Sequence, residues 1–596
     1  MEGKEGCWVT AVLNQTWDLD VFFRGGSSSP ELVAQLDRTE RDLAVLMAEV
    51  RTLPACPDDW ADFLDRFQQA AERFYEAVSF VYCLMSQDVR DRQAVVLYGR
   101  VQQSEAAVRS IISLLEGRTR DLTDAEWQAL VDHPRLAPAA FALNERRRRA
   151  SDQMETGREL LANDLAVDGY HAYDTLYSTV VGRITIPFEG QELSVGQAYN
   201  RFFDPDRAVR QALFVKWEEA FAKEADLFAH VLNHLAGFRL GLYRHRGWQS
   251  VLKEPLEMNR MRPETLEAMW DAVASARPTL RRFLDRKARL LGAEKLAWYD
   301  LTAPVNQATR NVTYDEAAAF VEEQFRKFSP RMADFAAQAF RRRWLEVEDR
   351  PHKAPGGYCT SFPQSKESRI FMTFSGDLGG VSTIAHELGH AYHTSLMFDL
   401  PFLVQDYAMN VAETASTFAE LIVSSAAVQS AASPEEKVAL LGARLDNSVA
   451  LLMNIHARFL FETRFYERRA NGLLSVAELN ALMEEAQREA YADGLQTYHP
   501  LFWASKGHFY GTQQPFYNFP YTFGFLFSAG IYARALAEGP AFEERYAALL
   551  RDTGRMTTEE LAMRHLGADL TRPDFWQSAL SVVLDDVEEF LRLTAE

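Results

Sequence analysis

Long amphipathic stretches dominate the chain and predict helices. After Ser29-Pro30, which fit an N-cap and a first helical position, the apolar residues Leu32, Leu36 and Leu43 follow the helical repeat. Further helices are predicted at about 60–87, 90–117, 123–133, 138–163, 205–243, 263–292, 314–327, 329–342, 404–428, 434–471, 475–493 and from 540 onward. The front third is therefore predicted as stacked helices, and no fixed period supports a solenoid.

Two short segments interrupt the helical pattern. Residues 182–193 alternate and turn at Glu189-Gly190, which predicts a hairpin. Residues 358–362 and 369–374 follow a loop rich in Pro and Gly and predict two short strands. One of these strands could pair with an extended peptide backbone, or the hairpin could simply support the helix that follows. The sequence favours neither alternative.

Composition and charge narrow the class of protein. With 47% hydrophobic and 25% charged residues, the 596-residue chain is an ordinary globular protein. A net charge of −20 argues against partners that present phosphates, namely nucleic acids and anionic membrane surfaces. No 18-residue apolar stretch is evident, so we expect no membrane span.

The N-terminus and the cysteines favour a cytoplasmic location. Residues 1–8 carry acids and no apolar run, unlike a signal peptide. The four cysteines, Cys7, Cys56, Cys83 and Cys359, are scattered without C-x-x-C spacing, as expected for reduced thiols.

The motif His386-Glu387-Leu388-Gly389-His390 carries the clearest chemistry. Residues four apart lie on one face of a helix, so His386 and His390 can bind one cation together. Glu387 lies between them in sequence and can reach a water on that cation. H-E-x-x-H is the signature of zinc peptidases. The alternative is a chance pair of histidines on a core helix.

A catalytic zinc needs a third protein ligand and a free position for water. The acids that follow the motif are Asp399, Asp406, Glu413 and Glu420. Thermolysin-type spacing fails, because Met409 and Asn410 stand where its Glu would be. The metzincin pattern also fails, because His393 and Leu396 replace its Gly and His.

Residues 411–420 predict a second helix with two acids on one face. Glu413 and Glu420 are seven apart, among small residues that would let two helices approach closely. One could bind the metal while the other holds a ligating His. A solvated acidic face is the alternative, although the surrounding segment is nearly uncharged.

Residues 503–524 are rich in aromatic side chains and punctuated by Gly and Pro, which predicts a loop leading into a helix. An aromatic core segment is one interpretation. The other is functional, because hydrolysis of a peptide creates an oxyanion that positioned O–H or N–H donors stabilise. His508 and the nearby tyrosines are the candidate donors.

The segments HELGHAYH, AETASTFAE and 508–521 together resemble the oligoendopeptidase F branch of the thimet-oligopeptidase family of zinc peptidases. The similarity is continuous from about residue 200 to 590. The first 170 residues resemble the family only in being helical. The resemblance implies that His386, His390 and Glu413 bind one Zn²⁺ per chain, with Glu420 as an outer acid. It also implies that Glu387 is the general base and that His508 stabilises the oxyanion. Its tyrosine partners are one or more of Tyr510, Tyr517 and Tyr521.

The same resemblance implies the fold and the activity. We expect a mainly α, two-lobed helical metallopeptidase with a deep central channel and a small β-sheet beside the motif helix. Residues 1–200 would form the N-terminal helical lobe and 201–596 the zinc-peptidase catalytic region. The activity would be hydrolysis of internal bonds of short peptides through a zinc-activated water. The alternatives are a zinc exopeptidase and a helical scaffold with a structural zinc. The sequence does not determine the oligomeric state.

Overall fold

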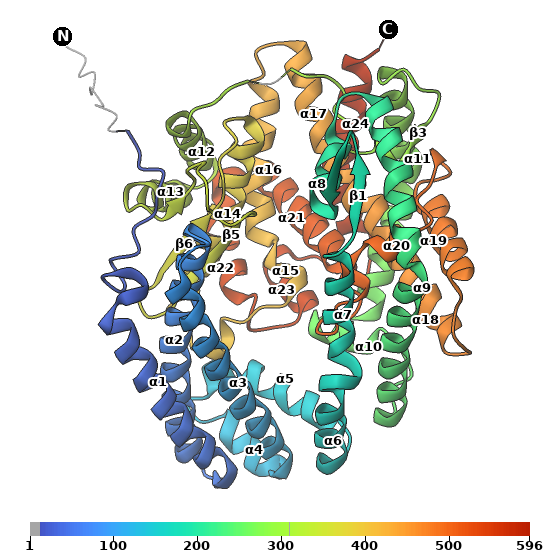
Figure 1. The fold of residues 1–596 in the computed structure, drawn as a ribbon. Coiled ribbons are helices and arrows are strands. Elements are labelled where there is room, and N and C mark those ends of the chain that lie inside the picture. Colours follow the sequence, from blue (N-terminus) through green and yellow to red (C-terminus); the bar gives the residue numbers. More distant parts are fainter. Residues whose placement is uncertain (1–11, 309, 596) are drawn as a thin grey trace, which may run out of the picture.

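The fold is mainly α-helical, as predicted (Figure 1). The computed structural model describes residues 12–308 and 310–595, so the predictions on residues 1–8 and on Cys7 lie outside the described residues. The first helices are α1 (Pro30–Glu49), α2 (Pro57–Gln87), α3 (Arg92–Asp121), α4 (Asp124–Val131), α5 (Ala140–Ser151), α6 (Thr156–Ala166) and α7 (Ala172–Val181). The middle helices are α8 (Val195–Asn200), α9 (Arg207–Arg246), α10 (Lys253–Met258), α11 (Pro263–Leu290), α12 (Tyr314–Phe328) and α13 (Pro330–Arg341).

The remaining helices surround the motif. They are α14 (Leu378–Ser395), α15 (Met409–Ala412), α16 (Thr414–Gln429), α17 (Pro434–Val449), α18 (Ile455–Arg469), α19 (Val476–Ala490), α20 (Phe502–Ser505), α21 (Phe519–Glu538), α22 (Glu543–Asp552), α23 (Thr558–Leu566) and α24 (Pro573–Leu593). A π-helical turn at Ala450–Asn454 joins α17 to α18. Ser29 caps α1, as the sequence predicts, because its side chain accepts a hydrogen bond from the Leu32 amide.

Two predicted helices are divided in the structure. The stretch 138–163 separates into α5 and α6, because Asp152 between them serves two tertiary contacts. Its carbonyl accepts from the Trp248 indole, and its carboxylate binds Lys253. The stretch 404–428 breaks at Glu413, which lies between α15 and α16 and not inside one helix.

Three small sheets among the described residues complete the fold. β1 (Thr185–Phe188) and β2 (Gln191–Ser194) form the predicted antiparallel hairpin. β3 (Leu296–Ala297) and β7 (Leu495–Thr497) pair in parallel, which the sequence did not indicate. The third sheet has the order β4 (Leu345–Glu346), β6 (Glu367–Phe371), β5 (Tyr358–Phe362), so β5 is an edge strand. Both β5 and β6 contact α14, as predicted for a sheet beside the motif helix.

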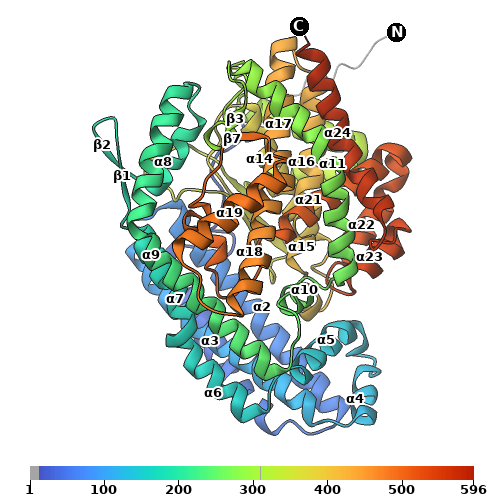
Figure 2. The same ribbon diagram turned by 90° about the vertical axis from the view of Figure 1, so that its right-hand side faces the viewer.

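The buried apolar residues form two main cores. One joins helices α1–α5 and includes Phe362 of β5 and Phe371 of β6. The other runs from Tyr177 to Phe590 and contains the motif helix. In both views of the ribbon, α3–α6 lie at the lower end, below α14, α16 and α21 (Figures 1 and 2). The division into residues 1–200 and 201–596 remains a prediction.

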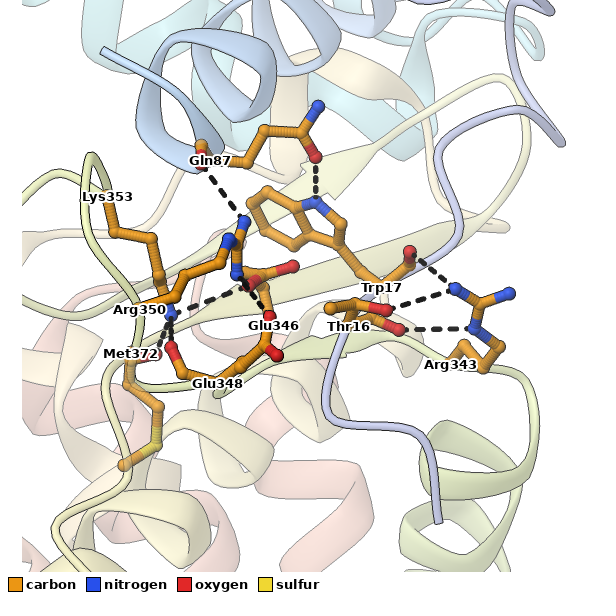
Figure 3. Close-up of polar contacts among 9 residues, drawn as sticks. All are labelled: Thr16, Trp17, Gln87, Arg343, Glu346, Glu348, Arg350, Lys353 and Met372. Atoms are coloured by element: carbon orange, nitrogen blue, oxygen red, sulfur yellow. Dashed lines mark hydrogen bonds and ion pairs between the residues drawn. The ribbon is translucent and has the colours of Figure 1, made fainter.

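Polar contacts fasten the N-terminal helices to the sheet that precedes α14 (Figure 3). The Trp17 indole donates to the side chain of Gln87 at the end of α2, over 2.7 Å. The Arg350 guanidinium donates to the Gln87 carbonyl at 3.0 Å and also pairs with Glu346 of β4. Arg343 donates to the Trp17 carbonyl at 3.3 Å. The sheet therefore links the N-terminal core to the motif helix.

Helices α14 and α16 approach each other very closely at Gly389. A Cβ atom built at this position would lie 2.5 Å from the Ala415 carbonyl oxygen and 2.6 Å from the Ser416 Cα. Only hydrogen fits in that space, so the glycine within the motif permits the contact. This is the close approach that the small residues of 411–420 predicted.

Two helical stretches, Met409–Gln429 and Pro434–Arg469, are long and apolar enough to cross a membrane, although the sequence led us to expect no membrane span. The share of the apolar window that is buried is 56% in the first and 44% in the second. In the first stretch, α16 packs against both α14 and α21. Core helices of soluble proteins can be as long and as apolar, so these two stretches are weak evidence for a membrane span.

We expect Gly389→Ala to destabilise the protein by about 1–3 kcal/mol, because the methyl group overpacks the contact with Ala415. The midpoint of urea unfolding measures the effect. Gly99→Ala is the matched control: Gly99 lies in α3 with no atom within 4 Å of its added Cβ, so the substitution should stabilise by about 0.4–1 kcal/mol. Equal midpoints for the two variants would contradict the close contact.

Candidate active site

The motif helix α14 begins at a capped turn and presents both histidines on one face. Asp377 is the N-cap, and its carboxylate accepts a hydrogen bond of 2.8 Å from the Gly380 amide. One helical turn separates His386 from His390, and their ring centroids are 4.9 Å apart. The second histidine therefore lies directly beyond the first along the helix.

Glu413 reaches both histidines from the junction of α15 and α16. Its Oε2 atom lies 3.3 Å from the Nε2 of His386 and 3.3 Å from the Nε2 of His390. Tetrahedral zinc with bonds of about 2.0–2.1 Å needs donor atoms about 3.3–3.4 Å apart. In the described part of the chain, these three residues form the one group of His, Cys, Asp and Glu side chains suited to a metal. Their donor set and spacing fit the expected zinc.

The charges of the group hold the histidines and the carboxylate together. Burial disfavours a charged His386, but hydrogen bonds to Glu413 and Glu420 outweigh it and raise the His386 pKa to about 10. Burial alone would raise the Glu413 pKa. Hydrogen bonds and charge interactions with His386 and His390 outweigh burial and hold this pKa far below its usual value. The pocket thus favours positive charge at the point where the three side chains meet.

Two further side chains orient the group. The Glu420 carboxylate lies 3.3 Å from Nδ1 of His386, which leaves Nε2 directed to the shared point. The Ser416 hydroxyl donates to Glu413 Oε2 at 2.7 Å. Sequence reasoning missed Ser416, although its position three residues after Glu413 on a predicted helix was the available signal.

Glu387 has one carboxylate oxygen without a partner. The residue is 7% exposed, and its enclosed Oε2 has no hydrogen-bond donor among the described residues. Burial raises its pKa above the usual value, with the two motif histidines opposing the shift. The residue just before β5 lies beside it, since a Cβ at Gly357 would lie 3.7 Å from Glu387 Oε1.

A cavity of about 640 Å³ adjoins the three converging side chains. His386, Glu413 and Glu420 form part of its wall, and Tyr521 of α21 lines it too. The rest of the wall is largely apolar and comes mainly from α14, α16, α17, α21 and α24. The cavity offers room for a peptide side chain next to the group.

The aromatic loop places three of its predicted residues in one cluster. The His508 ring stacks on Tyr517 at 5.3 Å between centroids and meets Tyr521 edge-on at 5.9 Å. Tyr521 lies close enough to Glu413 for that carboxylate to raise its pKa, together with burial and Tyr517. Burial, Arg458 and Lys506 lower the His508 pKa to about 3, so the imidazole is neutral.

Tyr510 does not join this cluster, which corrects its predicted part in binding the oxyanion. It is fully buried, its ring stacks on Tyr177 of α7 at 3.8 Å, and its hydroxyl is enclosed without a partner. The stacking with α7 holds the side chain in the core. His393 is also a packing residue, because it stacks on Tyr407 and bonds to Thr553.

Buried polar contacts fix the loop. The Glu462 carboxylate accepts from the Phe516 amide at 3.2 Å and from the Asn518 side chain at 2.6 Å. Tyr170, in the turn before α7, donates to the Thr512 carbonyl at 3.2 Å. The loop therefore depends on α18 from one side and on the N-terminal helices from the other.

The family model described as peptidase family M3 matches residues 203–582, more than half of the chain. The chain belongs to peptidase family M3. A second model, described as oligopeptidase F, matches residues 121–186. Membership of family M3 makes the protein a metallopeptidase that acts on peptides, as the sequence predicted. It also disfavours the alternative of a non-enzymatic scaffold.

Named relatives agree with the M3 assignment. The chain is 25% identical over 414 residues to the group B oligopeptidase PepB of Streptococcus agalactiae, which covers 68% of each protein. It is 22% identical over 408 residues to an oligoendopeptidase F homolog of Lactococcus lactis, covering 67% of each.

Solved structures share the M3 fold. A crystal structure of a protein from Chlamydophila abortus matches with a TM-score of 0.83 at 19% identity, covering 97% of this chain and 98% of that one. The oligoendopeptidase F of Enterococcus faecium matches with a TM-score of 0.67 at 18% identity, covering 94% and 97%. At these identities the likeness concerns the fold.

We expect Glu413→Ala to weaken zinc binding by more than about 100-fold, because two histidines alone remain. Glu420→Gln should weaken it by about 10- to 100-fold, since it keeps all three donors and disturbs only the orientation of His386. Competition with a chromophoric chelator measures both affinities. The matched control is Glu267→Ala on the exposed side of α11, which should bind zinc like the unaltered protein. Equal zinc affinity in all variants would refute the assigned ligands.

Proposed function

We propose that the protein is a zinc-dependent oligoendopeptidase that hydrolyses internal bonds of short peptides. The observation that carries this proposal is the convergence of His386, His390 and Glu413 beside the unpartnered carboxylate of Glu387. Two imidazoles and one carboxylate suit zinc better than harder cations such as Mg²⁺ or Ca²⁺. A bound zinc would polarise the scissile carbonyl and lower the pKa of a water to about 7.

Glu387 is the proposed general base. Its Oε2 atom has no hydrogen-bond donor among the described residues, so the carboxylate is available to accept a proton from the attacking water. The same carboxyl group can then pass that proton to the leaving amine. Its burial keeps the proton on this short path and away from bulk solvent.

His508 and Tyr521 are the proposed donors to the oxyanion. Tyr521 lines the same cavity as His386 and Glu413, and its phenol is a hydrogen-bond donor with a raised pKa. His508 is neutral and can donate through one ring nitrogen. Tyr517 stacks on His508 and fixes the plane of its ring.

The edge strand β5 is the proposed docking strand for the substrate backbone. Its last residues are already covered, because the Ser79 hydroxyl of α2 donates to the Ser361 carbonyl at 2.7 Å. Its first residues, next to Gly357 and Glu387, are the part that can pair with an extended peptide. Pairing there would draw the peptide past the proposed base.

We expect Glu387→Gln to retain one zinc per chain and to lose cleavage by several orders of magnitude, because the amide cannot accept the proton. Metal analysis and mass-spectrometric mapping of cleavage in a mixed peptide pool measure the two properties. Cleavage at the unaltered rate with zinc bound would refute the proposed function.

We expect Tyr521→Phe to lower kcat by about 10²–10³-fold with little change in KM, because it removes a donor needed only in the transition state. Steady-state kinetics on one peptide measures the effect. Tyr510→Phe is the matched control and should leave kcat unchanged, because the Tyr510 hydroxyl is enclosed away from the cluster. The reverse order of effects would favour Tyr510 over Tyr521 among the tyrosines that the sequence left open.

A further inference from the structure

Two cations near His508 have no acidic partner. Arg458 of α18 is 9% exposed, and its Nε and Nη2 atoms donate to the Asn454 side-chain oxygen at 2.9 and 2.6 Å. The side-chain ammonium of Lys506, between α20 and His508, makes no hydrogen bond with the described residues. Across residues 12–308 and 310–595, no Asp or Glu forms an ion pair with either side chain.

An unpaired cation away from water is costly, and here a buried one, Arg458, lies near a half-buried one, Lys506. Burial, followed by the charge of Arg458, lowers the Lys506 pKa to about 7. Burial also lowers the Arg458 pKa to about 10, with nearby phenols opposing the shift. The guanidinium of Arg458 and the ammonium of Lys506 lie 5.4 and 5.9 Å from the centre of the Phe502 ring. Such cation–π contacts recover only part of the lost hydration.

Both cations line a cavity of about 100 Å³. Six aromatic residues line it, namely Tyr199, Phe202, Trp298, Tyr299, Tyr491 and Phe502. The one carboxylate in the wall is Asp446, and it is already bonded to Lys287 at 2.6 Å. The cavity therefore has excess positive charge and is large enough for a small anionic group.

Asn454 positions Arg458 in the cation site, which we define as Arg458 and Lys506. Its side-chain oxygen holds Arg458, and its amide nitrogen donates to the Tyr491 hydroxyl at 3.1 Å. It is the last residue of the π-helical turn between α17 and α18. Such turns occur frequently at functional sites, and this one directs Asn454 and Arg458 to the same cavity.

The cations are close to the proposed oxyanion donors. Both lie near enough to His508 for their charges to lower its pKa, together with its burial. Tyr521 is within electrostatic reach of Arg458 and also of Glu413. Tyr521 is therefore near both the metal-binding group and Arg458 of the cation site.

We propose that Arg458 and Lys506 bind a carboxylate group of the peptide substrate. This inference rests on the proposed function, and it names a substrate class: peptides with a carboxylate at a fixed distance from the scissile bond. Arginine and lysine suit a carboxylate because both form charge-assisted hydrogen bonds with it. The carboxylate can belong to the free C-terminus or to an Asp or Glu side chain.

The test compares peptides that differ only in carboxylates. One series is N-acetylated, lacks Asp and Glu, has a free or an amidated C-terminus, and is lengthened by single alanines beyond a common cleavage site. A second series is amidated and carries one Glu or one Gln at successive positions. Cleavage gives kcat/KM, and calorimetry with zinc-loaded Glu387→Gln protein gives Kd without turnover.

We expect the carboxylate form to be preferred by about 10- to 100-fold in kcat/KM and in Kd at one position or length. Preference for the free C-terminus in the first series identifies the terminal carboxylate as the ligand. Preference for Glu over Gln in the second series identifies a side chain. Equal values for every matched pair would overturn the inference.

Substitutions assign the preference to the two cations. Lys506→Met should reduce the ratio between carboxylate and neutral peptides to near one, and Arg458→Gln should do the same. Because Arg458 is buried, Arg458→Gln counts as a test only when circular dichroism shows the native fold. Lys506→Met is by itself a sufficient test of the inference. The matched control is Lys437→Met, which removes a surface ion pair with Glu589 and should keep the full preference. An undiminished preference in Lys506→Met would also overturn the inference.

Failure of this inference is distinguishable from failure of the proposed function. If the protein cleaves peptides and Glu387→Gln does not, yet no carboxylate is preferred, only the role of Arg458 and Lys506 is wrong. If Glu387→Gln cleaves normally, the proposed chemistry is wrong, whatever the carboxylate preference.

Discussion

The contact between α14 and α16 at Gly389 is the constraint on which the candidate site depends. Because no side chain separates the helices there, Glu413 reaches the imidazoles of His386 and His390. Helix α21 supports the same geometry from behind: the Ser528 hydroxyl donates to the Glu413 carbonyl. The sheet β4–β6–β5 supports α14 on another side and connects it to the N-terminal core.

The charges around this contact are separated in space. Glu387 and Glu420 lie on α14 and α16, and Glu413 lies at the start of α16. The unpaired cations Arg458 and Lys506 line another cavity, near His508. A peptide that crosses Tyr521 would therefore meet a metal-binding group at one point and a positive cavity at another. This asymmetry gives a physical basis for choosing one direction and one register of the substrate.

Much of the fold followed from local pattern. Helical periodicity gave α2, α9, α11 and α12 within a few residues, because each helix buries one continuous apolar face. The breaks were harder to predict. Asp152 ends α5 through contacts with Trp248 and Lys253, and Glu413 separates α15 from α16, so distant partners decided both positions.

For the candidate site, the sequence by itself determined the metal-binding chemistry, because a helix places residues four apart on one face and makes His386 and His390 neighbours. Only the tertiary structure decided what depends on distant segments. It brought Glu413 to both histidines, left Tyr510 in the core against Tyr177, and placed Arg458 beside Lys506. Such contacts join elements far apart in the chain, so no local pattern encodes them.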